Sequence, residues 1–163
     1  MTKTKRLVFL SAVTAVAMVL SFVESRIPSL VPIPGVKVGL ANIAVIFALY
    51  RFGTGSAAGV SLVRVLLVSL LFGTPASFLY SLTGAVLAFA IMALCKRFSL
   101  FGAVGVSVLG GVCHNVGQIL MACLVTKTDL FSLYFPVLLL SGTLSGIVIG
   151  LAGALLVKRL PQL

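Results

Sequence analysis

The run LVFLSAVTAVAMVLSFV, residues 7–23, contains no charged side chain. At about 1.5 Å of helix per residue it is long enough to cross most of a bilayer core of about 30 Å. The rest of the chain has the same character, because 61% of its 163 residues are hydrophobic and 9% are charged, whereas a soluble domain has roughly 45–50% apolar residues. The composition predicts an all-α integral membrane protein with a single transmembrane domain over residues 1–163.

Glycine, proline and charged residues divide the chain into six apolar segments. Each is expected to be a transmembrane helix, because backbone polar groups cannot remain unpaired in lipid. The expected bounds are about 7–24, 36–50, 55–72, 76–95, 103–125 and 135–157. The second segment is short for a span, so we expect it either to tilt in from the preceding proline-rich loop or to be shielded by its neighbours.

The twelve lysine and arginine residues predict the orientation of the chain. With the N-terminus in the cytoplasm, alternating spans obey the positive-inside rule and leave only Arg64 within the membrane. The expected cytoplasmic set is Lys3, Lys5, Arg6, Arg51, Lys96, Arg97, Lys158 and Arg159, and the outer set is Arg26, Lys37 and Lys127. We therefore expect both termini in the cytoplasm, and a multi-pass protein surrounded by lipid in the bacterial cytoplasmic membrane.

Acidic residues are scarce, since Glu24 and Asp129 are the only two. This argues against chemistry that needs clustered carboxylates, including the paired aspartate-rich sites that bind Mg²⁺ and diphosphate in prenyl diphosphate synthases. The sequence also contains no Walker A motif and no C-x-x-C pair. The basic residues end apolar runs instead of forming the stripe typical of nucleic-acid binding. We therefore expect a protein that is not an enzyme and has no catalytic residues, cofactor, metal or nucleic-acid partner.

Arg64 lies near the middle of the third segment, within GVSLVRVLLVS, residues 59–69. An arginine at this depth costs about 2.5–3.5 kcal/mol on insertion scales, so other groups must offset its charge. It is either a structural arginine, bonded to carbonyls or to Glu24, or an anion-binding group in an internal cavity. Glu24 is the one plausible counter-ion within the chain, in a gating or structural ion pair.

The fifth segment contains the densest polar cluster, GGVCHNVGQ, residues 110–118. Helical spacing places His114 and Gln118 on one face, with Asn115 beside it. These side chains either join helices by hydrogen bonds, or bind the polar edge of a ligand at about the same depth in the membrane as Arg64.

Three further candidates lie nearer the outer mouth of such a site. Lys37 and Asn42 flank the start of the second segment, and Tyr80 lies early in the fourth. Tyr80 could stack on a ring or belong to an interfacial aromatic belt. The loop over residues 26–37 contains three prolines, which stiffen it in an extended form, and we expect it to act as a lid.

Small residues predict close contacts between helices. Gly142, Gly146 and Gly150 recur every four residues in the last segment, which indicates packing within the fold. Ser11 and Ala15 form a shorter ridge in the first segment, which could instead dock a membrane partner.

Five motifs in order resemble one family over nearly the whole chain. They are ESRIP (24–28), GVKVGLAN (35–42), RVL (64–66), FGTPASFLYSL (72–82) and GGVCHNVGQ (110–118). Together they resemble the Gx transporter family, often labelled heptaprenyl diphosphate synthase component I. That family looks like the substrate-binding S components of energy-coupling factor (ECF) transporters, which are six-helix membrane proteins with both termini in the cytoplasm.

The resemblance implies a substrate pocket open to the outside, gated by the first outer loop. It also implies that a small-residue ridge on the first helix meets the transmembrane coupling subunit of an ATPase module. In this chain the ridge would be Ser11 and Ala15, which departs from an alanine pair.

Our first functional expectation is a substrate-capture subunit of an ECF-type uptake transporter for a small vitamin-like molecule, with flavin the first guess. Arg64, His114, Asn115 and Gln118 would hold the substrate, and partner ATPases would supply the energy. The alternative is a non-catalytic membrane component of isoprenoid (heptaprenyl) diphosphate or menaquinone side-chain synthesis. In that case the polar face would contact a diphosphate, and a partner synthase would carry the catalytic acids.

Overall fold

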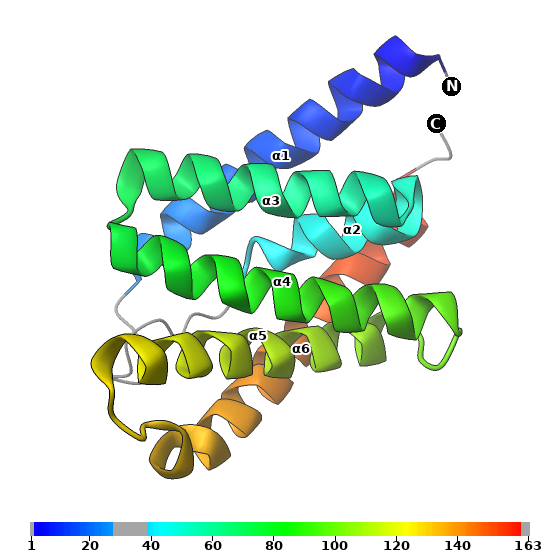
Figure 1. Cartoon of the computed structure of the whole chain (residues 1–163). Coiled ribbons are helices and arrows are strands. Elements are labelled where there is room, and N and C mark those ends of the chain that lie inside the picture. Colours follow the sequence, from blue (N-terminus) through cyan, green and yellow to red (C-terminus); the bar gives the residue numbers. More distant parts are fainter. Residues whose placement is uncertain (1, 28–38, 161–163) are drawn as a thin grey trace.

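The computed structural model describes residues 2–27 and 39–160, which form six α-helices in chain order (Figure 1). Their bounds are α1 (Lys3–Arg26), α2 (Asn42–Phe52), α3 (Thr54–Phe72), α4 (Pro75–Arg97), α5 (Ala103–Thr126) and α6 (Phe131–Arg159). No strand occurs over these residues. The expectation of an all-helical protein is confirmed for the described part of the chain.

Five of the helices are long and apolar enough to cross a membrane, as expected for a multi-pass membrane protein. The exception is α2, whose 11 residues extend about 16 Å at 1.5 Å per residue. The start of α1 and the end of α6 lie on the same side of the bundle (Figure 1). The described residues therefore form six helices, of which five have the length of a span.

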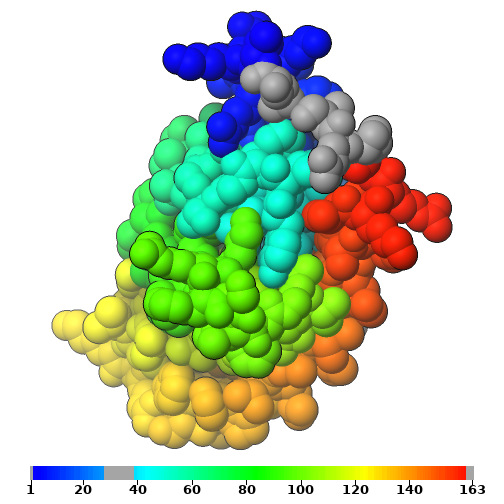
Figure 2. Space-filling view, turned by 90° about the vertical axis from the view of Figure 1, so that its right-hand side faces the viewer, coloured from blue at the N-terminus to red at the C-terminus, as the bar shows by residue number. Residues whose placement is uncertain are grey.

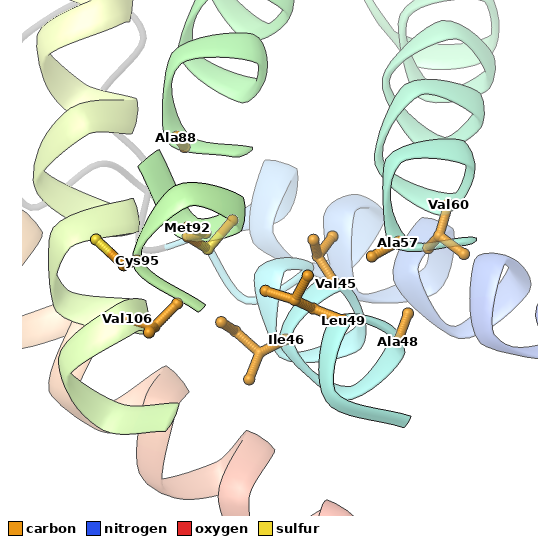
Figure 3. Packing of buried hydrophobic residues seen from close by; sticks show 10 residues of the cluster. All are labelled: Val45, Ile46, Ala48, Leu49, Ala57, Val60, Ala88, Met92, Cys95 and Val106. Carbon is orange, nitrogen blue, oxygen red and sulfur yellow. The ribbon is translucent and has the colours of Figure 1, made fainter. Parts of the chain in front are cut away.

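The short helix α2 is the centre of the bundle. Six consecutive residues of α2, numbers 44–49, are buried. Four of them, Val45, Ile46, Ala48 and Leu49, pack against α3, α4 and α5 in the main apolar cluster (Figure 3). The neighbouring helices thus shield α2, which was one of the two expectations for it. It begins at Asn42 instead of residue 36, because Gly39 has a left-handed φ of +83° and the chain turns through residues 40 and 41.

The helix ends follow local hydrogen bonds. Thr74 caps α4 reciprocally with Ser77, and Pro75 occupies the first turn as expected. At the start of α6, Asp129 accepts hydrogen bonds from the backbone N–H and the hydroxyl of Ser132, at 3.3 and 2.7 Å. The helix therefore begins at Phe131 instead of residue 135, and Pro136 lies inside it.

Glycines bring α5 and α6 into close contact. A Cβ at Gly146 would lie 2.5 Å from the Cα of Val108, and a Cβ at Gly111 would lie 2.5 Å from the carbonyl oxygen of Gly142. Real Cβ atoms do not approach so closely, so the backbone of one helix meets the backbone of the other at glycines, which carry no side chain. The glycine repeat of the last segment therefore packs within the fold, as expected.

One end of the bundle, which faces the viewer in Figure 2, contains the start of α1 (blue), the end of α2 (cyan) and the end of α6 (red). Basic residues lie at each of these helix ends. There Arg6 donates to the carbonyl oxygen of Phe52 and to Ser56, at 2.8 and 2.6 Å. Arg51 donates to the carbonyl oxygen of Leu160 at 2.7 Å. These cations thus satisfy carbonyl groups that the helix ends leave open.

Candidate functional site

A polar cavity lies within the first five helices, at the end of the bundle opposite the basic residues. Its walls are formed by the C-terminal parts of α1, α3 and α5 and by the N-terminal parts of α2 and α4. Its lining is Ser21, Glu24, Gly39, Asn42, Arg64, Val65, Val68, Ser69, Ser81, His114 and Gln118. Five of the residues predicted from the sequence therefore line one cavity. They are Glu24 on α1, Asn42 at the start of α2, Arg64 on α3, and His114 and Gln118 on α5.

Arg64 is the cation of this cavity, and its side chain is 9% exposed. One terminal nitrogen, Nη1, lies 3.4 Å from the hydroxyl oxygen of Ser21, and Glu24 is close enough to interact with the guanidinium electrostatically. The Nε atom is buried and has no hydrogen-bond partner among the described residues. The protein therefore supports the arginine from α1 but leaves part of its hydrogen-bonding capacity unused.

Gln118 and His114 enter the cavity from α5, and α4 holds them in place. A Cβ at Gly84 of α4 would lie 2.9 Å from Cγ of Gln118 and 2.8 Å from the carbonyl oxygen of His114. At the same crossing, a Cβ at Gly117 would lie 2.8 Å from the carbonyl oxygen of Thr83. Glycines therefore allow α4 to press directly on the two polar residues and to fix their position.

Asn115 faces a different neighbour. Its amide nitrogen donates to the carbonyl oxygen of Leu138 and to the hydroxyl of Ser141, both at 3.1 Å on α6. It lines a second, smaller cavity of about 10 Å³, which shares Gly39, Asn42 and His114 with the first. The structure thus separates Asn115 from Arg64 and Gln118, and ties its amide to the α5–α6 contact.

Three described candidates, Tyr80, Ser11 and Ala15, do not line either cavity. Tyr80 is half-buried and packs against an apolar cluster of Ile119, Ala122 and Leu138. Lys37 and most of the expected lid lie outside the described residues. Ser11 and Ala15 are exposed on α1, the candidate span with the smallest buried share.

Three serines of the cavity were not predicted from the sequence: Ser21, Ser69 and Ser81. Ser21 is three residues before Glu24, so the two share a helix face, and this spacing could have identified it. Ser69 lies five residues after Arg64, and no periodic pattern connects them. The serines give the cavity hydroxyl groups that can both donate and accept hydrogen bonds.

The volume of the Arg64 cavity is about 40 Å³, which is room for about three water molecules at roughly 10–15 Å³ each. Sites for drug-sized ligands have about 300–1,000 Å³. In this conformation the cavity can therefore hold one small polar group, and a larger ligand requires the surrounding helices to separate.

Comparison with known proteins gives one family. The family described as heptaprenyl diphosphate synthase component I matches residues 13–156. No curated protein and no solved structure matches the chain, so the likeness to ECF S components stays a prediction. Because the match extends from near the middle of α1 to near the end of α6, the chain belongs to the heptaprenyl diphosphate synthase component I family.

Proposed function

We propose that this protein is a membrane-embedded, non-catalytic subunit that binds a small molecule through an anionic group and leaves the chemistry to a partner. The observation that carries this proposal is the buried guanidinium of Arg64, which faces a polar cavity and has a nitrogen atom without a partner among the described residues. A charge at this depth is costly, and intramembrane ionisable residues are by default candidates for function.

The family description favours an isoprenoid diphosphate as the bound molecule. In this function the protein is the membrane component of a heptaprenyl diphosphate synthase, and the anionic head group lies against Arg64. A partner chain provides the aspartates that bind Mg²⁺, because this chain has only two acidic residues and they lie on α1 and before α6. The prenyl tail would lie among the apolar surfaces of the helices.

A second candidate is a substrate-capture subunit of an ECF-type uptake system, for a vitamin-like molecule such as a flavin. The position of the cavity favours it. The cavity lies at the end of the bundle away from the basic residues, and basic residues mark the cytoplasmic side. A ligand at Arg64 would thus be captured from outside. The exposed ridge of Ser11 and Ala15 on α1 would meet the coupling subunit of the partner ATPases.

One experiment tests both candidates. The detergent-solubilised protein is analysed by mass spectrometry for small molecules that copurify with it, and is then titrated with farnesyl diphosphate and with flavin mononucleotide while its melting temperature is recorded. A ligand that binds only the native state raises this temperature. A shift with farnesyl diphosphate alone supports the synthase component, and a shift with the flavin alone supports uptake. If no anionic molecule copurifies and neither compound shifts the melting temperature, the proposed function is wrong.

A further inference from the structure

The Arg64 cavity contains both donor and acceptor atoms that lack partners. Gln118 is 2% exposed, and neither its amide nitrogen nor its amide oxygen has a hydrogen-bond partner among the described residues. The same is true of Nε of Arg64. Native proteins pair nearly all buried polar atoms, so three unsatisfied atoms around one cavity indicate what an occupant must supply.

The unpaired atoms of Gln118 and Arg64 specify the chemistry of that occupant. The Nε–H of Arg64 and the NH₂ of Gln118 require acceptors, and an anionic acceptor is the strongest partner for a guanidinium. The carbonyl oxygen of Gln118 requires a donor. Exchanging the two ends of the amide would not change this requirement, because both of its polar atoms lack a partner.

The oxygen atoms of a diphosphate are hydrogen-bond acceptors. They suit the N–H groups of Arg64, but they leave the carbonyl oxygen of Gln118 without a donor. Glu24, a second acceptor on the wall, also disfavours a ligand that brings only negative oxygens. An amide, lactam or imide edge carries an N–H beside a C=O, and therefore matches the side-chain amide of Gln118 on both atoms.

We propose that the Arg64 cavity binds a molecule in which an anionic group accompanies an amide-like N–H and C=O edge, with the anion on Arg64 and the edge on Gln118. This inference rests on the anion binding that both candidate functions share, and of the two it favours the second, because an isoprenoid diphosphate presents only its diphosphate to the cavity. A ligand that presents only a diphosphate to the cavity is disfavoured.

A matched pair of small acids tests the inference. Oxamate and pyruvate have the same shape and a carboxylate in common, but oxamate has an NH₂ group where pyruvate has a methyl group. The full-length protein in detergent is titrated with oxamate, pyruvate and inorganic diphosphate, and the melting temperature is recorded. We expect oxamate to raise the melting temperature at concentrations at least about tenfold lower than those that pyruvate requires, which is the effect of about one hydrogen bond. Oxamate should also be effective at lower concentrations than diphosphate.

The Gln118→Met variant removes the amide edge at similar length. It should respond equally to oxamate and pyruvate, because it has no amide that could distinguish the NH₂ group of one from the methyl group of the other. Because Gln118 has no partner to lose, replacing it with an apolar side chain should not lower stability. The preference of the unsubstituted protein for oxamate over pyruvate provides the test even if this variant fails to fold.

The outcomes distinguish the amide-edge inference from the more general proposal that the cavity binds an anion. Equal responses to oxamate and pyruvate in the unsubstituted protein, or a preference for diphosphate, would overturn the inference and leave anion binding intact. If none of the three compounds shifts the melting temperature, the inference is also overturned, and the titration with farnesyl diphosphate and flavin mononucleotide decides the proposed function separately.

Discussion

The carboxylate of Glu24 accepts a hydrogen bond from the backbone N–H of Gly39, and so connects the end of α1 to the start of α2. Gly39 adopts a left-handed φ of +83° there, and a Cβ at this residue would lie 3.2 Å from the amide nitrogen of Asn42. The same carboxylate interacts electrostatically with Arg64. One buried acid therefore links the entry into α2 with the cation of the cavity.

Two substitutions separate these roles of Glu24. Glu24→Gln retains an oxygen that can accept from Gly39 but removes the charge near Arg64, whereas Glu24→Ala removes both. Removing one partner of a buried charge pair costs about 3–5 kcal/mol, and the alanine variant additionally leaves the Gly39 N–H unpaired. We expect unfolding temperatures, measured by circular dichroism in detergent, to fall in the order wild type, glutamine, alanine. Two variants as stable as the wild type would show that Glu24 has neither role.

Arg64→Ala should abolish binding of anionic ligands and leave a folded, membrane-inserted protein. The physical reason is that the guanidinium is the cation on the cavity wall. The variant also loses the positive charge that interacts with buried Glu24, so we expect it to fold but to melt at a lower temperature than the wild type. Ligand-induced shifts of the melting temperature measure binding, and the helical circular dichroism signal measures folding. Arg64→Met, with a longer apolar side chain, is the matched control for lost volume. Loss of folding in both variants, with ligand protection unchanged in the remaining folded protein, would make Arg64 structural.

Asn115→Ala should lower stability without altering ligand affinity. Its amide nitrogen donates to Leu138 and Ser141 on α6. The hydroxyl of Ser141 still donates to the carbonyl oxygen of Leu138 in the variant, so we expect the loss of ordinary hydrogen bonds, at about 0.5–1.5 kcal/mol each. Thermal unfolding and ligand titration of the same sample measure the two effects. A variant with normal stability and weakened binding would instead show that Asn115 contacts the ligand.

Gly146→Ala should destabilise the contact between α5 and α6. Its Cβ would lie 2.5 Å from the Cα of Val108, so the helices must move apart, at a typical cost of about 1–3 kcal/mol. Gly59→Ala is the control, because a Cβ there meets no atom within 4 Å and alanine favours a helix interior by up to about 1 kcal/mol. The two variants should therefore shift the unfolding temperature in opposite directions, and a common direction would contradict the close crossing.

The sequence predicted most of the polar residues that line the cavity, because burial in a membrane makes polar residues conspicuous. Arg64, His114 and Gln118 cannot face lipid, so their helical positions alone indicate the interior. Which interior side chain serves a ligand is a different question. Asn115 and Gln118 are three residues apart on one helix, and only the crossing of α6 decides that the first has partners while the second does not.

The turn before α2 and the position of Tyr80 were beyond prediction for a similar reason. A glycine permits a left-handed φ but does not require one, so the residue at which α2 begins depends on the contact of Gly39 with Glu24. Tyr80 suits either a ring ligand or apolar packing, and its neighbours on α5 and α6 select the packing.

The Arg64 cavity also lies where the two halves of the chain join. Ser21, Asn42 and Arg64 belong to the first three helices, whereas Ser81 and Gln118 belong to the last three. A molecule in this cavity contacts both halves at once, so the free energy of its binding also stabilises the contact between them. Filling or emptying a volume of about 40 Å³ is thereby coupled to how firmly the two halves of the molecule hold together.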